Sequence, residues 1–147
     1  MAEKLIVTSD QAPRPFNIVG EHITVLASGA QTGSCEIFHQ RGPEGSGPPP
    51  HHHPWDESFY VLEGEVGFVA DGEEAVAHQG TLVHLPAGTI HGFQFGRGGG
   101  SMISITSRQA ASLMFADFDR EISPENPDLA KLVELGAPYG LTVADPS

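Results

Sequence analysis

The sequence has few of the residues that mark several large classes of protein. Its one cysteine, Cys35, has no partner for an internal disulfide, a zinc ribbon or a redox pair. Only 7 Lys and Arg residues stand against 19 Asp and Glu residues, so the formal net charge is -12. A charge of this sign repels phosphate backbones and anionic lipids, and no basic cluster reverses it locally. We therefore expect neither nucleic-acid nor membrane partners.

Long apolar runs are also missing. No segment approaches the roughly 20 apolar residues of a membrane span. The opening MAEKLIVTSD lacks the apolar core and the small-residue cleavage site of a secretory signal. These absences predict a cytoplasmic protein. The length of 147 residues predicts a single domain over 1–147, with a core at about 20–107 and a helical tail at about 108–147.

The chain is rich in turn-forming residues and in short β-type segments. Its 18 glycines and 12 prolines count against a helical bundle. Between His22 and Ser107, β-branched and aromatic runs alternate with turn residues: HITVLAS, SCEIFHQ, SFYVLEG, EVGFVA, EAVAHQ, TLVHLP and SMISITS. This pattern predicts an all-β antiparallel sandwich or barrel.

Turn residues locate the expected connections. Glycine in LEGEV (62–66) and Asp-Gly in ADGEE (70–74) each predict a hairpin turn, because these residues adopt positive φ at low cost. The segment RGPEGSGPPP (41–50) predicts an exposed loop, since its prolines lack the donors of a central strand. This loop would deliver His51 to the domain.

Beyond Arg108 the pattern changes to helical spacing. Both QAASLMFADF and NPDLAKLVEL carry apolar residues three and four positions apart. Asn126-Pro127 is typical of a helix start and Gly136 of a helix end. We expect this helical tail to close one mouth of the barrel.

Three of the 8 histidines are consecutive, at 51–53. In an extended chain the side chains of His51 and His53 point to one face and that of His52 to the other. A bulge would exchange these roles. Glu57 and His91 can reach the same side as the outer two histidines, and three imidazoles with one carboxylate suit a divalent transition metal. The remaining histidines are typical of structural or surface positions: His22, His39, His78 and His84.

Two spacings in this region resemble the two motifs of the cupin superfamily. The first is matched by Gly45-x5-His51-x-His53-x3-Glu57-x6-Gly64. The second is matched by Gly80-x5-Pro86-x-Gly88-x2-His91. The second motif usually ends in Asn four residues past its histidine, where this chain has Phe95, but that Asn is not a metal ligand.

The resemblance implies a cupin double-stranded β-helix, which is a jelly-roll barrel, with short C-terminal helices. The chain is similar to the small single-domain monocupins grouped with quercetinases, which commonly pair as homodimers by exchanging N-terminal strands. The implied metal set is His51, His53, Glu57 and His91, which would hold one divalent ion per chain. The sequence leaves Fe, Mn, Ni, Co and Zn open.

The walls of the expected pocket are apolar. Phe59 and Val61 share the strand parity of Glu57, and Phe93 and Phe95 share that of His91. An apolar pocket that ends in a metal fits a small aromatic or enolic substrate whose oxygens displace water. Trp55, in the turn between the ligands, is expected either to pack or to form the pocket rim.

Three functions stay open. Resemblance to quercetinase-like cupins implies a dioxygenase in which Glu57 is both ligand and proton acceptor. The alternative is a non-redox cyclase or isomerase, similar to the cupin cyclases of aromatic polyketide pathways, with zinc as Lewis acid. His84 or His39 could then serve as an extra ligand or acid/base, and we name Glu57 and His84 as candidate catalytic residues. A non-catalytic metal-binding or small-molecule-binding module is the third reading.

Overall fold

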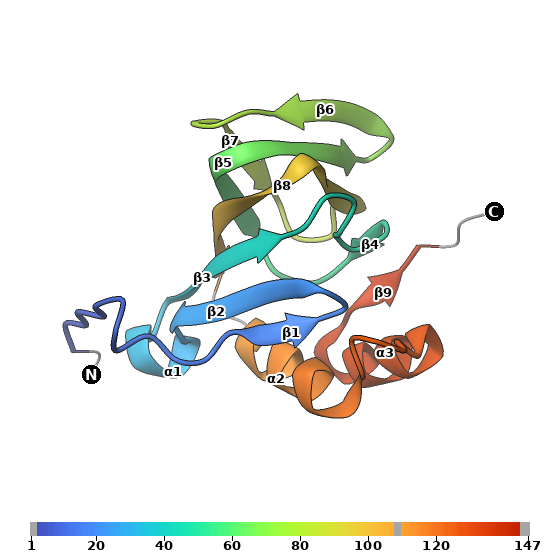
Figure 1. Ribbon diagram of the computed structural model, residues 1–147. Coiled ribbons are helices and arrows are strands. Elements are labelled where there is room, and N and C mark those ends of the chain that lie inside the picture. The colour runs from blue at the N-terminus through green and yellow to red at the C-terminus, as the bar shows by residue number, and fades with distance from the viewer. Residues whose placement is uncertain (1–2, 108–109, 145–147) are drawn as a thin grey trace.

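The protein is described by a computed structural model that covers residues 3–107 and 110–144 (Figure 1). Its strands join into one nine-stranded sheet. In chain order the elements are β1 (Phe16–Ile18), β2 (Glu21–Ala27), α1 (Gly29–Thr32), β3 (Cys35–Gly42), β4 (His51–His52), β5 (Glu57–Ala70), β6 (Glu73–Ala77), β7 (Leu82–Leu85), β8 (His91–Ser107), α2 (Ala111–Glu121), α3 (Leu129–Gly136), a 3-10 turn (Ala137–Tyr139) and β9 (Thr142–Val143).

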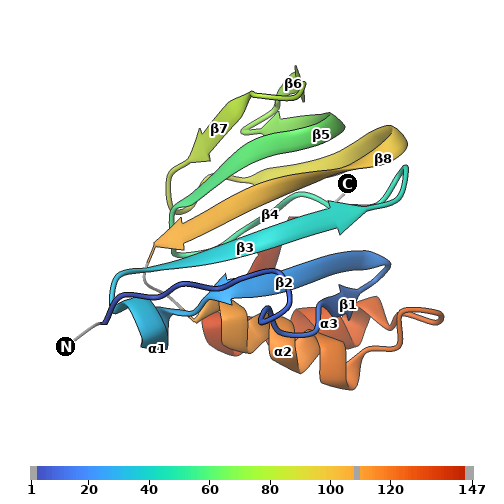
Figure 2. The ribbon, with the colours of Figure 1, turned by 60° about the vertical axis from the view of Figure 1, so that its left-hand side comes forward.

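The sheet curls around two long strands, β5 and β8. Strands run in the order β1-β2-β3-β8-β4-β9, and β5 pairs with β6, β7 and β8, with antiparallel pairing throughout. Curling places β6 and β7 at the end away from β1, while α2 and α3 lie beneath β1 and β2 (Figure 2). The prediction of an all-β architecture with C-terminal helices is confirmed.

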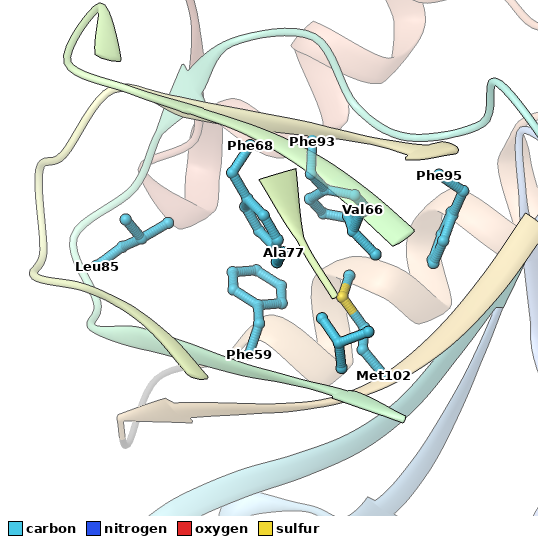
Figure 3. Close-up of a cluster of buried hydrophobic side chains, with 9 residues drawn as sticks. Phe59, Val66, Phe68, Ala77, Leu85, Phe93, Phe95 and Met102 are labelled. Carbon is cyan, nitrogen blue, oxygen red and sulfur yellow. The ribbon is translucent and has the colours of Figure 1, made fainter. Parts of the chain in front are cut away.

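Alternation along the strands builds the interior of the barrel. On β5, Glu57, Phe59 and Val61 are buried while Tyr60 faces outward. The rings of Phe59, Phe68 and Phe93 pack with centroids 5.3 to 5.8 Å apart (Figure 3). We call the following set the barrel core: Phe59, Val61, Val66, Phe68, Ala77, Leu85, Phe93, Phe95 and Met102.

One of the two predicted hairpins forms and the other does not. Asp71 and Gly72 have φ of 48° and 84° and turn β5 into β6, as predicted. The prediction of a hairpin at 62–66 is wrong, because β5 continues through these residues. Gly64 (φ 76°) instead marks a bulge, where a Cβ atom would collide with the carbonyl oxygen of Gly99.

The segment at 41–50 is an exposed loop after its first two residues, which extend β3 to Gly42. It leads directly into β4, so the prediction that it delivers His51 is confirmed. The glycine-rich segment GRGGG (96–100) does not form a separate turn. It lies within β8, opposite the bulge of β5.

The helices are attached to the sheet by buried polar contacts. Glu36 of β3 accepts hydrogen bonds from the backbone N–H groups of Ser112 and Gly29, and the first of these caps α2. Asp128 caps α3 by accepting from the N–H of Lys131, so this helix begins later than Asn126 and ends at Gly136. Among the described residues, no helix combines the length and the apolar character needed to cross a membrane.

A second apolar cluster lies between the sheet and the helices. Its members, which we call the helix-side cluster, are Ile23, Phe38, Trp55, Ala111, Met114, Phe118, Ile122 and Leu141. It joins residues from β2 and β3 to α2 and the last described segment. Organisation of the chain as one domain over 1–147 stays a prediction.

Candidate metal centre

Three histidines converge where β4 pairs with β8. His51 lies directly opposite His91 in the sheet, and His53 follows β4 by one residue. One nitrogen of each ring lies within 4.8 Å of the others. His52 instead pairs with Thr142 of β9 and lies outside this group. Residues 40 positions apart in the chain therefore share one site because two strands are hydrogen-bonded.

Each of the three rings is oriented by a backbone carbonyl. The Nδ1 atoms of His51 and His91 lie 2.8 Å from the carbonyl oxygens of Pro49 and Thr89. Nδ1 of His53 lies 3.1 Å from the carbonyl oxygen of Trp55. A carbonyl can only accept, so each Nδ1 donates, and in the neutral ring Nε2 then keeps the lone pair that can bind a metal. This outer contact is typical of histidines that bind a metal.

Glu57, the first residue of β5, supplies the carboxylate. Its side chain is buried, with Oε1 3.2 Å from Nε2 of His53 and 3.5 Å from Nε2 of His91. Burial alone would raise the pKa of Glu57, but hydrogen bonding and the charges of the two imidazoles outweigh it and lower the pKa to about 2. Glu57 is therefore a carboxylate at neutral pH.

Burial and neighbouring charges shift the pKa values of His51 and His91 in opposite directions. Burial, followed by the charge of His91, lowers the pKa of His51 to about 4, so this ring is neutral at pH 7. Burial also lowers the pKa of His91, but the Glu57 carboxylate outweighs it and the net shift is upward. Nε2 of His91 is buried with no hydrogen-bond partner among the described residues.

This donor set fits a divalent transition metal. In the three-histidine cluster, one nitrogen of each ring lies within 4.8 Å of the others. Lone pairs this close repel one another unless a cation lies between them. Glu57 borders the cluster through the contacts of its Oε1 with His53 and His91, but it is not one of the three mutually close donors. Three nitrogens and one oxygen suit the ions from Mn to Zn and leave coordination positions open.

Trp55 connects the candidate metal centre to the helix-side cluster. Its ring stacks on His53 with centroids 4.3 Å apart and planes 11° from parallel. It is 3% exposed and also borders the cavity described below. The two roles that the sequence left open, packing and pocket wall, therefore coincide in one side chain.

A cavity of about 1180 Å³ opens beside these residues. His51, His53 and Glu57 line it, as do apolar residues of α2 and α3 such as Met114 and Leu132. Both helices lie beneath β1 and β2 (Figure 2), and the helical tail forms part of the cavity wall. A large, mostly apolar cavity is typical of sites that bind small organic molecules.

Only half of the expected apolar wall faces the cavity. Phe93 and Phe95 line it, whereas Phe59 and Val61 lie behind it in the barrel core. All four side chains point inward, as parity requires. However, Phe59 packs against Phe68 and Phe93, which separate it from the open space (Figure 3). Strand parity alone could not distinguish these two positions.

Two polar residues in the cavity were missed from the sequence. Glu21 begins β2 and shares the inward parity of Ile23, a signal that was hidden because the expected strand started at His22. It is 6% exposed, and burial followed by the charge of Glu57 raises its pKa to about 8. Gln40 of β3 also lines the cavity and donates to the hydroxyl of Ser104 at 2.6 Å.

The structure does not bring His84 or His39 to the metal centre. His84 is exposed on the outer face of β7, where its Nδ1 lies 2.7 Å from the hydroxyl of Ser58. His39 borders a separate shallow hollow beside Arg41 and Arg97. Both residues sit at outward positions of their strands, so the geometry gives the expected acid/base or ligand role of either residue no support.

Comparison with known proteins relates this geometry to a family. Residues 38–104 match the cupin domain family. The quercetin 2,3-dioxygenase of Bacillus subtilis (strain 168) is 32% identical over 74 residues, which are 50% of this chain and 22% of that protein. The chain thus spans less than a quarter of this relative.

Two solved structures show the same fold at low identity. An RmlC-like cupin from Shewanella frigidimarina has a TM-score of 0.67 and 20% identity, with 76% of this chain and 96% of that chain covered. The polyketide cyclase RemF from Streptomyces resistomycificus has a TM-score of 0.59 and 22% identity, with 74% and 81% covered. The predicted cupin fold and the resemblance to quercetinases and cupin cyclases are confirmed.

Proposed function

Since residues 38–104 match the cupin domain family, we propose that the protein is a metal-dependent cupin enzyme acting on a small aromatic or enolic molecule. A dioxygenase of the quercetinase type is the first candidate. The observation that carries the proposal is the convergence of three imidazole rings, with the Glu57 carboxylate beside two of them, next to a largely apolar cavity. Sequence similarity to a quercetin 2,3-dioxygenase favours this reaction class.

His51, His53, Glu57 and His91 would hold one divalent ion of Fe, Mn, Ni, Co or Zn. When bound, such an ion lowers the pKa of a substrate hydroxyl and polarises the oxygen that binds it. Glu57 can accept the released proton, because its carboxylate is ionised at neutral pH. Stacking on Trp55 keeps the His53 ring in place, and the apolar lining restricts water.

A non-redox cyclase or isomerase is the second candidate. It is favoured by the structural likeness to the polyketide cyclase RemF, and it would use zinc as the Lewis acid. In this reading Glu57 moves the proton between substrate positions, and no dioxygen is consumed. A non-catalytic metal-binding or small-molecule-binding module is the third candidate.

Elemental analysis followed by oxygen uptake tests these candidates. Untagged protein purified without added metal is analysed for metal per chain, with His91→Ala as the ligand variant and His84→Ala as the matched control. Oxygen uptake with quercetin and 3-hydroxyflavone is then measured after loading with each metal. About one metal per chain, lost in His91→Ala and kept in His84→Ala, is the expected result.

The outcomes separate the reaction classes. Oxygen consumption that depends on a redox-active metal favours the dioxygenase. Tight zinc binding, with no oxygen consumed under any metal, favours the cyclase or isomerase. Failure to bind any of the five metals after reconstitution would overturn the enzyme proposal.

We further propose that the enzyme is a cytoplasmic homodimer. The first property keeps the expectation stated above, which rests on the lack of a long apolar run and on the negative net charge, and the second rests on the habit of similar small cupins. Light scattering after size-exclusion chromatography measures the mass directly. A particle of one 15.6 kDa chain would contradict the dimer.

A further inference from the structure

Among the described residues, three carboxyl side chains are buried, and two of them have evident partners. Glu36 is 2% exposed and accepts hydrogen bonds from Ser112 and Gly29, which attach α2 and α1 to the sheet. Glu57 contacts His53 and His91 at the metal centre. Glu21 differs from both, because its Oε1 atom is buried and has no partner among the described residues. Burying such an atom is unfavourable, so the carboxyl group needs another reason to be there.

The position of Glu21 is firmly held. It follows the β1–β2 turn and pairs with Ile18 across the hairpin. Asn17, the residue before Ile18 in β1, donates its backbone N–H to Asp119 of α2 at 2.8 Å. The β1–β2 hairpin that carries Glu21 is therefore attached to a helix that lines the cavity. A loosely placed loop does not explain the unsatisfied oxygen.

Glu21 faces the same cavity as the metal ligands. The cavity is lined by Glu21 together with His51, His53 and Glu57. The charge of Glu57 acts on Glu21, so the two carboxyl groups share one electrostatic environment. The lining beside Glu21 in the sheet includes the apolar Ile18 and Ile23, and also Gln40, whose amide already donates to Ser104. A molecule bound at the metal centre would thus meet, in Glu21, a carboxyl oxygen that no described residue satisfies.

We propose that Glu21 is the specificity-determining residue of the cavity and hydrogen-bonds a hydroxyl group of a metal-chelating substrate. The inference rests on the proposed function and names the substrate class more closely: an enol or phenol that binds the metal and carries a further hydroxyl. A substrate hydroxyl supplies the donor that Oε1 lacks. A chelator without that hydroxyl would leave Oε1 unsatisfied and bind more weakly, as in sites built to recognise a hydroxyl.

Two pairs of chelators test the proposal. Catechol and pyrogallol differ by one hydroxyl, and 3-hydroxyflavone is compared with the more hydroxylated quercetin. Each is titrated into the full chain loaded with cobalt(II). The signal is the fluorescence of Trp55, which is the only tryptophan in the chain and stacks on His53. Wild type is compared with Glu21→Leu, Glu21→Gln and the control Glu73→Gln, which changes an exposed carboxylate of β6.

In at least one pair, wild type should favour the more hydroxylated chelator by at least about tenfold over its partner. Glu21→Leu should abolish or reverse this preference, because an apolar side chain matches the simpler chelator. Glu21→Gln should keep part of it, since the amide oxygen still accepts a hydrogen bond. Glu73→Gln should behave as wild type. Cobalt content and melting temperature show whether each variant is loaded and folded.

The result that would overturn the inference is an equal preference in wild type and Glu21→Leu for both pairs, with cobalt bound in each. The proposed function would survive that outcome. Wild-type protein that takes up no cobalt, or takes it up and binds none of the four chelators, would overturn the proposed function and this inference together.

Discussion

The two halves of the interior are filled in different ways. On the side of β5, β6 and β7, the barrel core is closed by its own side chains, and the rings of Phe59, Phe68 and Phe93 pack within 5.8 Å of one another (Figure 3). On the side of β1, β2 and the helices, the helix-side cluster borders a cavity of about 1180 Å³. Phe68, Phe93 and Phe95 belong to both, as parts of the barrel core and as walls of the cavity, which also reaches β5 and β6.

This difference explains where a site can exist. A close-packed interior leaves no room for a ligand, but it fixes the strands that carry His91 and Glu57. The hollow side offers space, and its polar groups can meet a bound molecule there. The candidate metal ligands lie at the boundary between the two, where β4 meets β8. The packed half keeps the strands of the site rigid, and the hollow half gives a bound molecule access to it.

Truncating one aromatic ring in each half should give the largest difference in the free energy of unfolding. Phe59→Ala leaves a hole in the packed barrel core and should lower the free energy of unfolding by about 3–5 kcal/mol. Phe115→Ala, on α2 facing the cavity, should cost roughly 1–2 kcal/mol because this ring is only partly buried and its space joins an existing cavity. Urea denaturation measures both. Equal losses would contradict the division into a packed half and a hollow half.

Removing a ligand at the boundary should be next in size. His53→Ala should weaken metal binding by more than about 100-fold, since one of four donors is lost and Glu57 loses its 3.2 Å contact. Competition against a chelating dye measures the affinity. His84→Ala is the control, because His84 lies on the outer face of β7 and should leave affinity unchanged. Similar weakening in both variants would argue against the assigned ligand set.

The buried carboxyl on the hollow side predicts a pH effect. The pKa of Glu21 is raised from 4.5 to about 8 in the folded state, so between these pH values the folded protein binds more protons than the unfolded chain. Stability must then fall as pH rises through this window. Glu21→Gln, measured without metal, should remove this fall and gain up to about 5 kcal/mol above pH 8.

Comparison of thermal unfolding at both ends of the window checks this prediction. Below pH 4.5 wild type and Glu21→Gln should be nearly alike, because Glu21 is protonated in both states there. Metal binding should shrink the difference, since it neutralises the charge of Glu57 that helps raise the pKa. A gain that is the same at every pH would show that ionisation of Glu21 is not its cause.

The smallest predicted effect lies at the turn before Glu21. Val19 has φ of 52°, a left-handed conformation that β-branched residues rarely adopt, and it precedes Gly20 in a two-residue hairpin turn. Val19→Asn should stabilise the fold by about 1 kcal/mol, because Asn-Gly suits such turns. Val76→Asn, at an exposed site within β6, should not stabilise it. Chemical denaturation measures the stability of both variants. An equal gain in the two would exclude the turn as the cause.

Much of the architecture could be predicted because its signals are local. Strand alternation has a period of two, so inward parity of His51, His53 and Phe93 follows from their neighbours alone. Asp71-Gly72 specifies its own turn in the same way. The hairpin expected at 62–66 failed because Gly64 is needed for a reason outside its segment, the close approach of Gly99 on another strand. A glycine between strand-like runs is thus consistent with either a hairpin turn or a bulge within one strand, and the sequence around Gly64 does not distinguish them.

The sequence by itself determined the strand pattern, the motif spacing and the set of residues that can reach a metal. Only the tertiary structure decided that Glu21 shares the cavity, that Phe59 and Val61 lie behind it, and that His84 faces away from it. Parity states which face of a strand a side chain occupies. Whether that face meets packed rings, a ligand or solvent depends on how the sheet curls and where α2 and α3 cover it, and these are contacts between residues far apart in the chain.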